Sequence, residues 1–210
     1  MRIRFTYYKN KSLQYTSTLD IQLIWERACR RSSLPIAYSQ GFHPQARIQQ
    51  ALPLPLGFTS KCEIVDIWFE TEIPLETLIQ NLQSLNYLGI EIIETEIIPE
   101  NAPSLQIMIE KSEYGVYPIG KSPDDLAFRI SNFLSATSLP RIRNNKPYDI
   151  RPLVMALAIE TKPTPYISML LSAHGGATAR PEEVISTLGL EPYNFNYIRT
   201  KIIINPQLRG

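Results

Sequence analysis

The chain has 210 residues, of which 44% are hydrophobic and 20% charged, enough apolar content for one large hydrophobic core or two small ones. No run approaches the roughly 18 apolar residues of a membrane-spanning helix, and the first residues lack the apolar segment of a signal peptide. We therefore expect a folded, cytoplasmic protein with no membrane partner. Cys29 and Cys62 have neither metal-ligand nor disulfide spacing, so we expect them to be ordinary packed side chains.

The net charge of +1 conceals an uneven distribution of charge along the chain. Residues 1–60 carry eight Lys and Arg against two acidic residues, residues 61–113 carry two against eleven, and residues 114–210 carry eleven against seven. The three segments therefore have charges of +6, −9 and +4. A basic region can attract a polyanion even in a nearly neutral chain, because the local field acts on the ligand. The alternative is that these charges lie on solvated faces.

The first half of the chain has the pattern of a β-α-β-β-α-β unit. The expected elements are a strand at 2–7, a helix at 17–31, paired strands at 47–56 and 63–70, a helix at 74–85 and a strand at 90–98. Pro53 and Pro55 lack the amide donors of a ladder, so their strand should be interrupted or lie at a sheet edge. The buried residues expected in the first helix are Leu19, Leu23, Ile24 and Ala28.

The second half repeats this order of elements after a proline-rich segment at 99–103, which predicts a boundary between domains 1–99 and 104–210. The expected elements are a strand at 105–109, a helix at 122–134, paired strands at 149–160 and 165–173, a helix at 180–188 and a strand at 197–204. The predicted fold class is α+β, with two tandem ferredoxin-like units whose sheets are antiparallel. No residue-level repeat supports the duplication, which depends on the order of elements alone.

Arg27, Arg30 and Arg31 are the first candidate binding residues. Their spacing of three and four residues places them on one face of the first helix, near its C-terminus, where cations complement the helix dipole. The sequence leaves two interpretations equally open. The three side chains could bind phosphate, or they could form a solvated face on which Glu26 pairs with Arg30.

The loop that follows this helix contains no acidic residue between positions 34 and 60. Its candidate binding residues are Tyr38, Gly41, Phe42, His43 and Arg47. Aromatic and donor side chains of this kind can stack on bases and bind phosphates, and the planar guanidinium of Arg47 suits a phosphate. His43 has no partner at metal-ligand spacing, since His174 is the only other histidine, and we expect neither a metal site nor a catalytic role.

Two further candidates lie in the second half of the chain. Arg151 comes two residues after Asp149, so it could form an ion pair with that carboxylate or bind a phosphate. Gly175 and Gly176 precede a helix that begins near Arg180, and these three residues are candidates for binding an anion. The pattern is that of an anion-binding turn or of a simple tight turn. The Lys of a phosphate-binding loop is missing, which argues against nucleoside triphosphate hydrolysis.

Three stretches of the chain have a pattern known from a protein family, namely RFTYYKNKSLQYTSTLDIQLIWERACRRSSLPIAYSQGFHPQARIQQALPLPLGFTSKCEIVD, DIRPLV and GGATARPEEVISTLGL. Through these stretches most of the chain resembles the radical SAM-linked protein family. Members are free proteins encoded beside a radical SAM enzyme, or C-terminal domains of cobalamin-type radical SAM proteins. The resemblance implies an accessory module with no cofactor of its own, because the iron–sulfur cluster and S-adenosylmethionine belong to the partner enzyme. Neighbouring ribonuclease genes in some members imply an RNA substrate.

Two segments depart from the pattern of that family. Ser17-Thr18-Leu19-Asp20 stands where the family has Ser-His-Leu-Asp, and Gly41-Phe42-His43-Pro44-Gln45-Ala46 stands where it has Gly-Phe-Asn-Pro-His-Pro. Both changes argue against an essential general base and favour a binding surface. We therefore expect an RNA-recognition module for tRNA or rRNA. The alternatives are a metal-independent endoribonuclease, similar in architecture to CRISPR repeat-processing enzymes, with His43 or Tyr38 as base, and a protein-docking module that uses the acidic segment 61–113.

Overall fold

The structure, a computed structural model, describes residues 1–174 and 177–205 as an α+β protein of two compact units. The first unit contains Met1–Ile109 together with the described end of the chain at 204–205, and the second contains Glu110–Ile203. The backbone amide of Asn205 donates to the carbonyl of Met108 at 2.8 Å, which holds the end of the chain on the first unit. The division thus lies further along the chain than the proline-rich segment at 99–103.

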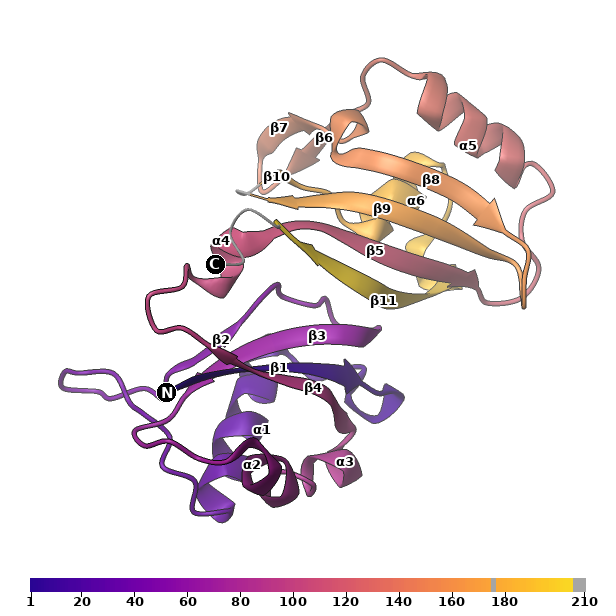
Figure 1. The fold of residues 1–210 in the computed structure, drawn as a ribbon. Coiled ribbons are helices and arrows are strands. Elements are labelled where there is room, and N and C mark those ends of the chain that lie inside the picture. The colour runs from indigo at the N-terminus through magenta and orange to yellow at the C-terminus, as the bar shows by residue number, and fades with distance from the viewer. Residues whose placement is uncertain (175–176, 206–210) are drawn as a thin grey trace. The chain divides into compact units, whose positions relative to one another are not determined.

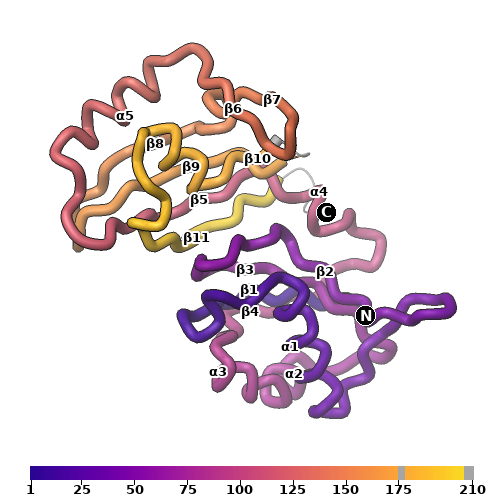
Figure 2. Tube along the Cα trace, turned by 180° about the vertical axis from the view of Figure 1, so that it is seen from behind, coloured from indigo at the N-terminus to yellow at the C-terminus, as the bar shows by residue number. Residues whose placement is uncertain are grey.

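The first unit is an antiparallel sheet covered by helices on one side, as both views of the chain show (Figure 1, Figure 2). Its elements are β1 (Arg2–Lys9), α1 (Thr18–Arg31), β2 (Ile48–Gln50), β3 (Phe58–Trp68), α2 (Leu75–Asn81), α3 (Leu85–Leu88) and β4 (Ile90–Ile98), with α4 (Leu105–Met108) at its end and a short 3-10 helix at Lys11–Leu13. The strand order is β4-β1-β3-β2. β2 is a three-residue edge strand that ends before Pro53 and Pro55, which confirms the expected interruption.

The packing of α1 against the sheet organises the core of this unit. Trp25 is fully buried, with its ring centroid 5.2 Å from that of Phe5 and 5.3 Å from that of Tyr7 on β1. The prediction of the buried stripe was wrong at two positions, since Leu19 is 73% and Leu23 44% exposed. The buried residues of α1 are Ile21, Trp25, Ala28 and Cys29. The helix is rotated so that the large indole, rather than the leucines, fills the space beneath β1.

The opposite face of β1 carries an ion cluster, formed by Arg2, Arg4 and Asp66, which we call the buried charge cluster. Arg2 and Arg4 alternate with Ile3 and Phe5 along the strand, yet they are only 2% and 7% exposed, and Asp66 on β3 is 0% exposed. The Asp66 carboxylate accepts two hydrogen bonds from Arg2, at 2.9 and 2.6 Å, and two from Arg4, at 2.8 and 3.0 Å. Arg2 also donates to the carbonyls of Ala102 and Pro103, so the segment before α4 covers the cluster.

The second unit is also an antiparallel sheet with two main helices. Its elements are β5 (Ile109–Pro118), α5 (Leu126–Ser135), β6 (Pro140–Arg143), β7 (Lys146–Asp149), β8 (Val154–Glu160), β9 (Tyr166–His174), β10 (Ala177–Thr178), α6 (Pro181–Thr187) and β11 (Phe195–Ile204), with short 3-10 helices at Arg151–Leu153 and Pro192–Asn194. β8 and β10 both pair with β9, β9 pairs with β5, and β5 neighbours β11. Arg129 of α5 donates to the carbonyl of Leu188, which ties α5 to the end of α6.

Two predictions for this half of the chain were wrong, and one hairpin was not predicted. Residues 105–108 form a helix rather than a strand, with Leu105 and Met108 buried one turn apart. The predicted strand at 149–160 begins only at Val154. The segment before it is the hairpin β6–β7, whose turn residues Asn144 and Asn145 both have positive φ. Two asparagines in this conformation are typical of a tight hairpin turn, because their short polar side chains tolerate it.

Candidate nucleic-acid interface

The three arginines of α1 lie together on its exposed face. The helix begins after Ser17, whose hydroxyl accepts a hydrogen bond from the amide of Asp20 at 3.2 Å and so caps the helix. Its other face is buried, so the spacing of Arg27, Arg30 and Arg31 leaves all three exposed in its last two turns. Ser32, directly after the helix, donates to the carbonyl of Asn81 at 2.6 Å and fixes this end of α1 against α2.

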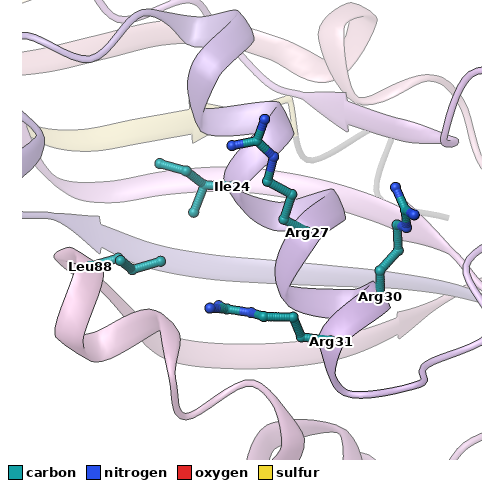
Figure 3. Close-up of a pocket in the computed structure, with 5 residues that line it drawn as sticks. All are labelled: Ile24, Arg27, Arg30, Arg31 and Leu88. Atoms are coloured by element: carbon teal, nitrogen blue, oxygen red, sulfur yellow. The ribbon is translucent and has the colours of Figure 1, made fainter.

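A pocket of about 600 Å³ lies beside these arginines, and we call it the arginine pocket. Its lining residues are Ile24, Arg27, Arg30, Arg31 and Leu88. In the close-up the three guanidinium groups fan out from the helix, and Arg31 extends toward Leu88 (Figure 3). One wall of the pocket is therefore apolar, formed by Ile24 of α1 and Leu88 of α3, and the rest is cationic.

Among the residues that the structure describes, no acidic side chain lines the arginine pocket. Among the described residues, none of the ion pairs involves Arg27, Arg30 or Arg31, so the predicted alternative of an ion pair between Glu26 and Arg30 is not formed. Glu26 instead accepts a hydrogen bond from the hydroxyl of Tyr38 at 3.3 Å. Three cations at a helix C-terminus, without paired carboxylates, give this part of the surface a positive field suited to an anion.

The loop between α1 and β2 is a narrow hairpin that projects from the first unit (Figure 1). The amide of Ser39 donates to the carbonyl of Gln45 at 2.8 Å, and the amide of Gln45 donates to the hydroxyl of Ser39 at 3.0 Å. The tip between them is exposed, and Phe42 is 102% exposed. Gly41 has a φ of +131°, which favours glycine at this position. The tip presents an aromatic ring and the imidazole of His43 to solvent.

Tyr38 connects the base of this loop to α1. Its hydroxyl contacts Glu26, one turn before Arg30, and the charge of Arg30 acts on the phenol. Partial burial, followed by the Glu26 carboxylate, raises the pKa of Tyr38 above its ordinary value, so the hydroxyl remains a donor at neutral pH. The structure therefore brings Tyr38 and the predicted arginines of α1 into one region, whereas the tip at 41–43 projects from it.

Arg47 lies further along the same segment and stacks on an aromatic ring. Its guanidinium carbon is 4.9 Å from the ring centroid of Trp68, and the guanidinium carbon of Arg2 lies at the same distance from that ring. Arg47 is exposed, so it can still donate to a phosphate while its position is restricted by the indole.

Of the candidate binding residues in the second unit, Arg151 is held by backbone carbonyls, unlike the exposed arginines of α1. The Arg151 guanidinium donates to the carbonyls of Val154 and Leu134, both at 3.0 Å, so it caps the end of α5. The idea that Arg151 and Asp149 share one face of a strand was wrong, because Asp149 ends β7 and Arg151 begins a 3-10 helix. Arg180 is exposed immediately before α6. Gly175 and Gly176 lie outside the described residues.

In the part of the chain that the structure describes, none of the hydrogen bonds involves the imidazole of His43. Within residues 1–174 and 177–205, no three His, Cys, Asp or Glu side chains are placed to hold a metal ion. Over the same ranges, no helix has both the length and the apolarity to cross a bilayer. Burial raises the pKa of the Cys29 thiol to about 12, which keeps it protonated, as expected for a packed side chain.

Leu88 is the contributor to the arginine pocket that the sequence did not identify. It ends the four-residue helix α3, and Gly89 follows with a φ of +99°. A Cβ on Gly89 would lie 2.0 Å from the Ser12 hydroxyl, so only glycine fits there. Gly89 is the feature of the sequence that could have identified Leu88, since glycine commonly ends a helix. It also fixes the turn that places Leu88 opposite α1.

A second polar cluster lies in the second unit, around the start of α6. Glu183 accepts hydrogen bonds from Nε and Nη2 of Arg143, the first at 2.8 Å, and Arg143 lies 4.7 Å from the ring centroid of Tyr148. Beside this pair, Oε2 of Glu182 is buried and has no hydrogen-bond partner among the described residues. Burial is the main cause that raises the pKa of Glu182, and Glu183 adds to it, while Arg180 and Arg143 act in the opposite direction.

Replacing Glu182 by glutamine should raise the Tm by a few degrees at pH 7. The glutamate ionises near pH 4.3 in the unfolded chain but at higher pH in the folded protein, because its folded pKa is raised. Between these two pKa values the folded state binds more protons than the unfolded state, so the free energy of unfolding falls as pH rises. Above both pKa values the free energy of unfolding stays at this lower level. Glutamine removes this loss, and below about pH 4 the two proteins should unfold together.

The measurement is thermal unfolding across the pH range, with Glu191→Gln as the control because Glu191 is exposed. The interpretation is wrong if E182Q shows the same change of Tm with pH as the unmodified protein.

Comparisons with known proteins place the chain in a family. The family described as "Uncharacterized protein conserved in bacteria (DUF2344)" matches residues 2–181. A search of curated proteins finds no match. Among solved structures, a chain of "Crystal Structure of a Cbf5-Nop10-Gar1 Complex" is similar over 94% of this chain and 49% of that one, with 9% identity and a TM-score of 0.48. The protein thus spans about half the length of that chain.

Proposed function

The chain belongs to the DUF2344 family of bacterial proteins, and we propose that it is an accessory module that binds tRNA or rRNA and presents it to a radical SAM modification enzyme. The observation that carries the RNA-binding part is the arginine pocket, with three exposed guanidinium groups and no acidic residue among its described lining residues. Guanidinium groups bind phosphate oxygens through paired hydrogen bonds. The iron–sulfur cluster and S-adenosylmethionine belong to the partner enzyme in this proposal.

The proposal includes a tandem ferredoxin-like arrangement. The order β4-β1-β3-β2 in the first unit and β11-β5-β9-β8 in the second both place the fourth and first main strands of a unit side by side, then the third and the second. The same order in both units supports two copies of one β-α-β-β-α-β design. Such a scaffold leaves its loops and helix faces free for binding, so the function depends on the arginine pocket rather than on the fold.

A plot of the logarithm of RNA affinity against the logarithm of salt concentration tests the RNA-binding part. Each phosphate neutralised on single-stranded RNA contributes a slope of about −0.7, so three arginines should give a slope of about −2 or steeper. The measurement is fluorescence anisotropy of labelled tRNA and rRNA fragments over a range of KCl concentrations. A slope near zero, or no binding at low salt, would remove this proposal.

The docking alternative has its own structural support at β4. This strand pairs only with β1 in the first unit, and its outer residues include Ile93 and Ile97, which are 47% and 57% exposed. Ile97 also lines a pocket of about 460 Å³ with Ile73 and Pro74. An open strand with exposed apolar residues can receive a strand from another protein. Co-purification of the radical SAM enzyme after nuclease treatment, with no RNA retained, would favour this function over RNA binding.

A further inference from the structure

We propose that the arginine pocket holds one unpaired nucleotide of the RNA, with the base against Ile24 and Leu88 and the adjoining phosphates on Arg27, Arg30 and Arg31. This inference rests on the proposed RNA-binding function and narrows it to unpaired segments of the RNA. It also assigns a role to Leu88 and to its neighbour Tyr87.

The size and the two-sided chemistry of the arginine pocket indicate a nucleotide rather than a free phosphate. The pocket is open to solvent, and its volume of about 600 Å³ falls within the size range of sites that bind small organic molecules. A phosphate ion would use the guanidinium groups but would leave the wall of Ile24 and Leu88 in contact with water. A nucleotide matches both parts, because its base has an apolar face and its phosphate has the charge that arginines bind.

The arrangement of the guanidinium groups indicates a polymer. The groups fan out from α1, with Arg31 extending toward Leu88 and Arg30 directed elsewhere, rather than converging on one point (Figure 3). Diverging cations can each reach a different phosphate of a chain, whereas a single anion would be held best by groups that converge. The phosphates on either side of one nucleotide are therefore the natural partners of this set.

We include Tyr87 in the proposed site as its rim, because it adjoins Leu88 in the chain. It precedes Leu88 in α3 and is 94% exposed, so its ring makes almost no contact with the protein. An exposed aromatic ring beside a cationic pocket is a typical stacking platform for an unpaired base. In an A-form duplex the base faces are stacked inside the helix, so neither this ring nor the pocket wall could reach them. The site should therefore select loops, bulges or single strands.

The experiment compares single-stranded RNA of about 12 nucleotides with a duplex that has the same number of phosphates. Binding to the full-length protein is followed by fluorescence anisotropy, and base insertion is followed by a 2-aminopurine placed in the strand. The variants are Tyr87→Ala and Leu88→Ser. Their matched controls are Tyr15→Ala and Leu56→Ser, because Tyr15 and Leu56 are also exposed in the first unit, at 78% and 60%, and neither lines the pocket.

We expect the single strand to bind at least about tenfold more tightly than the duplex, with a change in 2-aminopurine fluorescence on binding. Y87A and L88S should each weaken single-strand binding about five- to tenfold and leave duplex binding unchanged, and the controls should match the unmodified protein. Equal affinity for both RNAs, with both variants unaffected, would overturn the unpaired-nucleotide site while leaving RNA binding intact. Failure of every RNA to bind would overturn the proposed function itself.

Discussion

Replacing Asp66 by alanine should lower the free energy of unfolding of the first unit by about 3–5 kcal/mol. Asp66 is fully buried and accepts all four of the hydrogen bonds that Arg2 and Arg4 donate within the buried charge cluster. Without the carboxylate, two buried guanidinium groups lose their only counter-ion in that cluster. Removing one partner of a buried ion pair is costly because the remaining charge is desolvated and unpaired.

Urea unfolding followed by tryptophan fluorescence is the appropriate measurement. The chain has two tryptophans, Trp25 and Trp68, and both lie in the first unit, so the signal reports on that unit alone. The matched control is Glu100→Ala in the same unit. Glu100 pairs with the N-terminal amine at 3.1 Å, but its side chain is 74% exposed, so its loss should have almost no effect. If D66A unfolds at the same urea concentration as E100A, the cluster is not a stabilising feature.

The buried charge cluster also shows where the sequence stopped being informative. The alternation of apolar and polar residues along β1 predicted a strand, which is confirmed, but it did not indicate that Arg2 and Arg4 are buried. Their partner Asp66 is more than sixty residues away, and the segment at 102–103 that covers them follows later still. Alternation reports which residues share a face, and it does not report what packs on that face. Arg2 and Arg4 contribute to the charge of +6 on residues 1–60, but Asp66 neutralises part of their charge in the folded unit.

In the helix α1, too, the sequence predicted the element but not how it packs. The start at Ser17 and the exposure of the three arginines followed from spacing alone, whereas the buried stripe did not. Leu19 and Leu23 are as apolar as the residues that are buried, and the choice between two possible stripes depends on the fit of Trp25 against Phe5 and Tyr7. That fit is a property of the packed unit, so sequence periodicity could not decide it.

The candidate site, like α1, could be predicted only in part from the sequence. Its charged half came from one helix and was readable from the i, i+3, i+4 spacing. Its apolar half depends on Leu88, which reaches α1 only because α3 ends at Gly89 and packs back toward the first helix. A pocket made by two segments far apart in sequence has no local signature, so sequence reasoning found the cations and missed the wall.

Replacing Arg27, Arg30 and Arg31 together by glutamine should weaken RNA binding about a hundredfold at low salt. The same change should reduce the magnitude of the salt slope by about 2, since each lost phosphate contact on a single strand contributes about 0.7. The three side chains are exposed and take part in none of the described ion pairs, so the loss should come from RNA contacts rather than from unfolding. Circular dichroism should show an intact helix, with at most about 1 kcal/mol of stability lost per arginine at the helix C-terminus.

The matched control removes three charges from other exposed positions, through Lys11→Gln, Lys61→Gln and Lys146→Gln. If RNA binding depended only on total charge, both triple variants would lose affinity equally. If the arginine pocket binds the phosphates, the arginine variant should lose far more, and Arg→Lys replacement at the same three positions should recover the salt slope but only part of the affinity. Lysine keeps the charge and loses the planar paired donors, so this partial recovery separates general attraction from specific binding of phosphate by guanidinium groups.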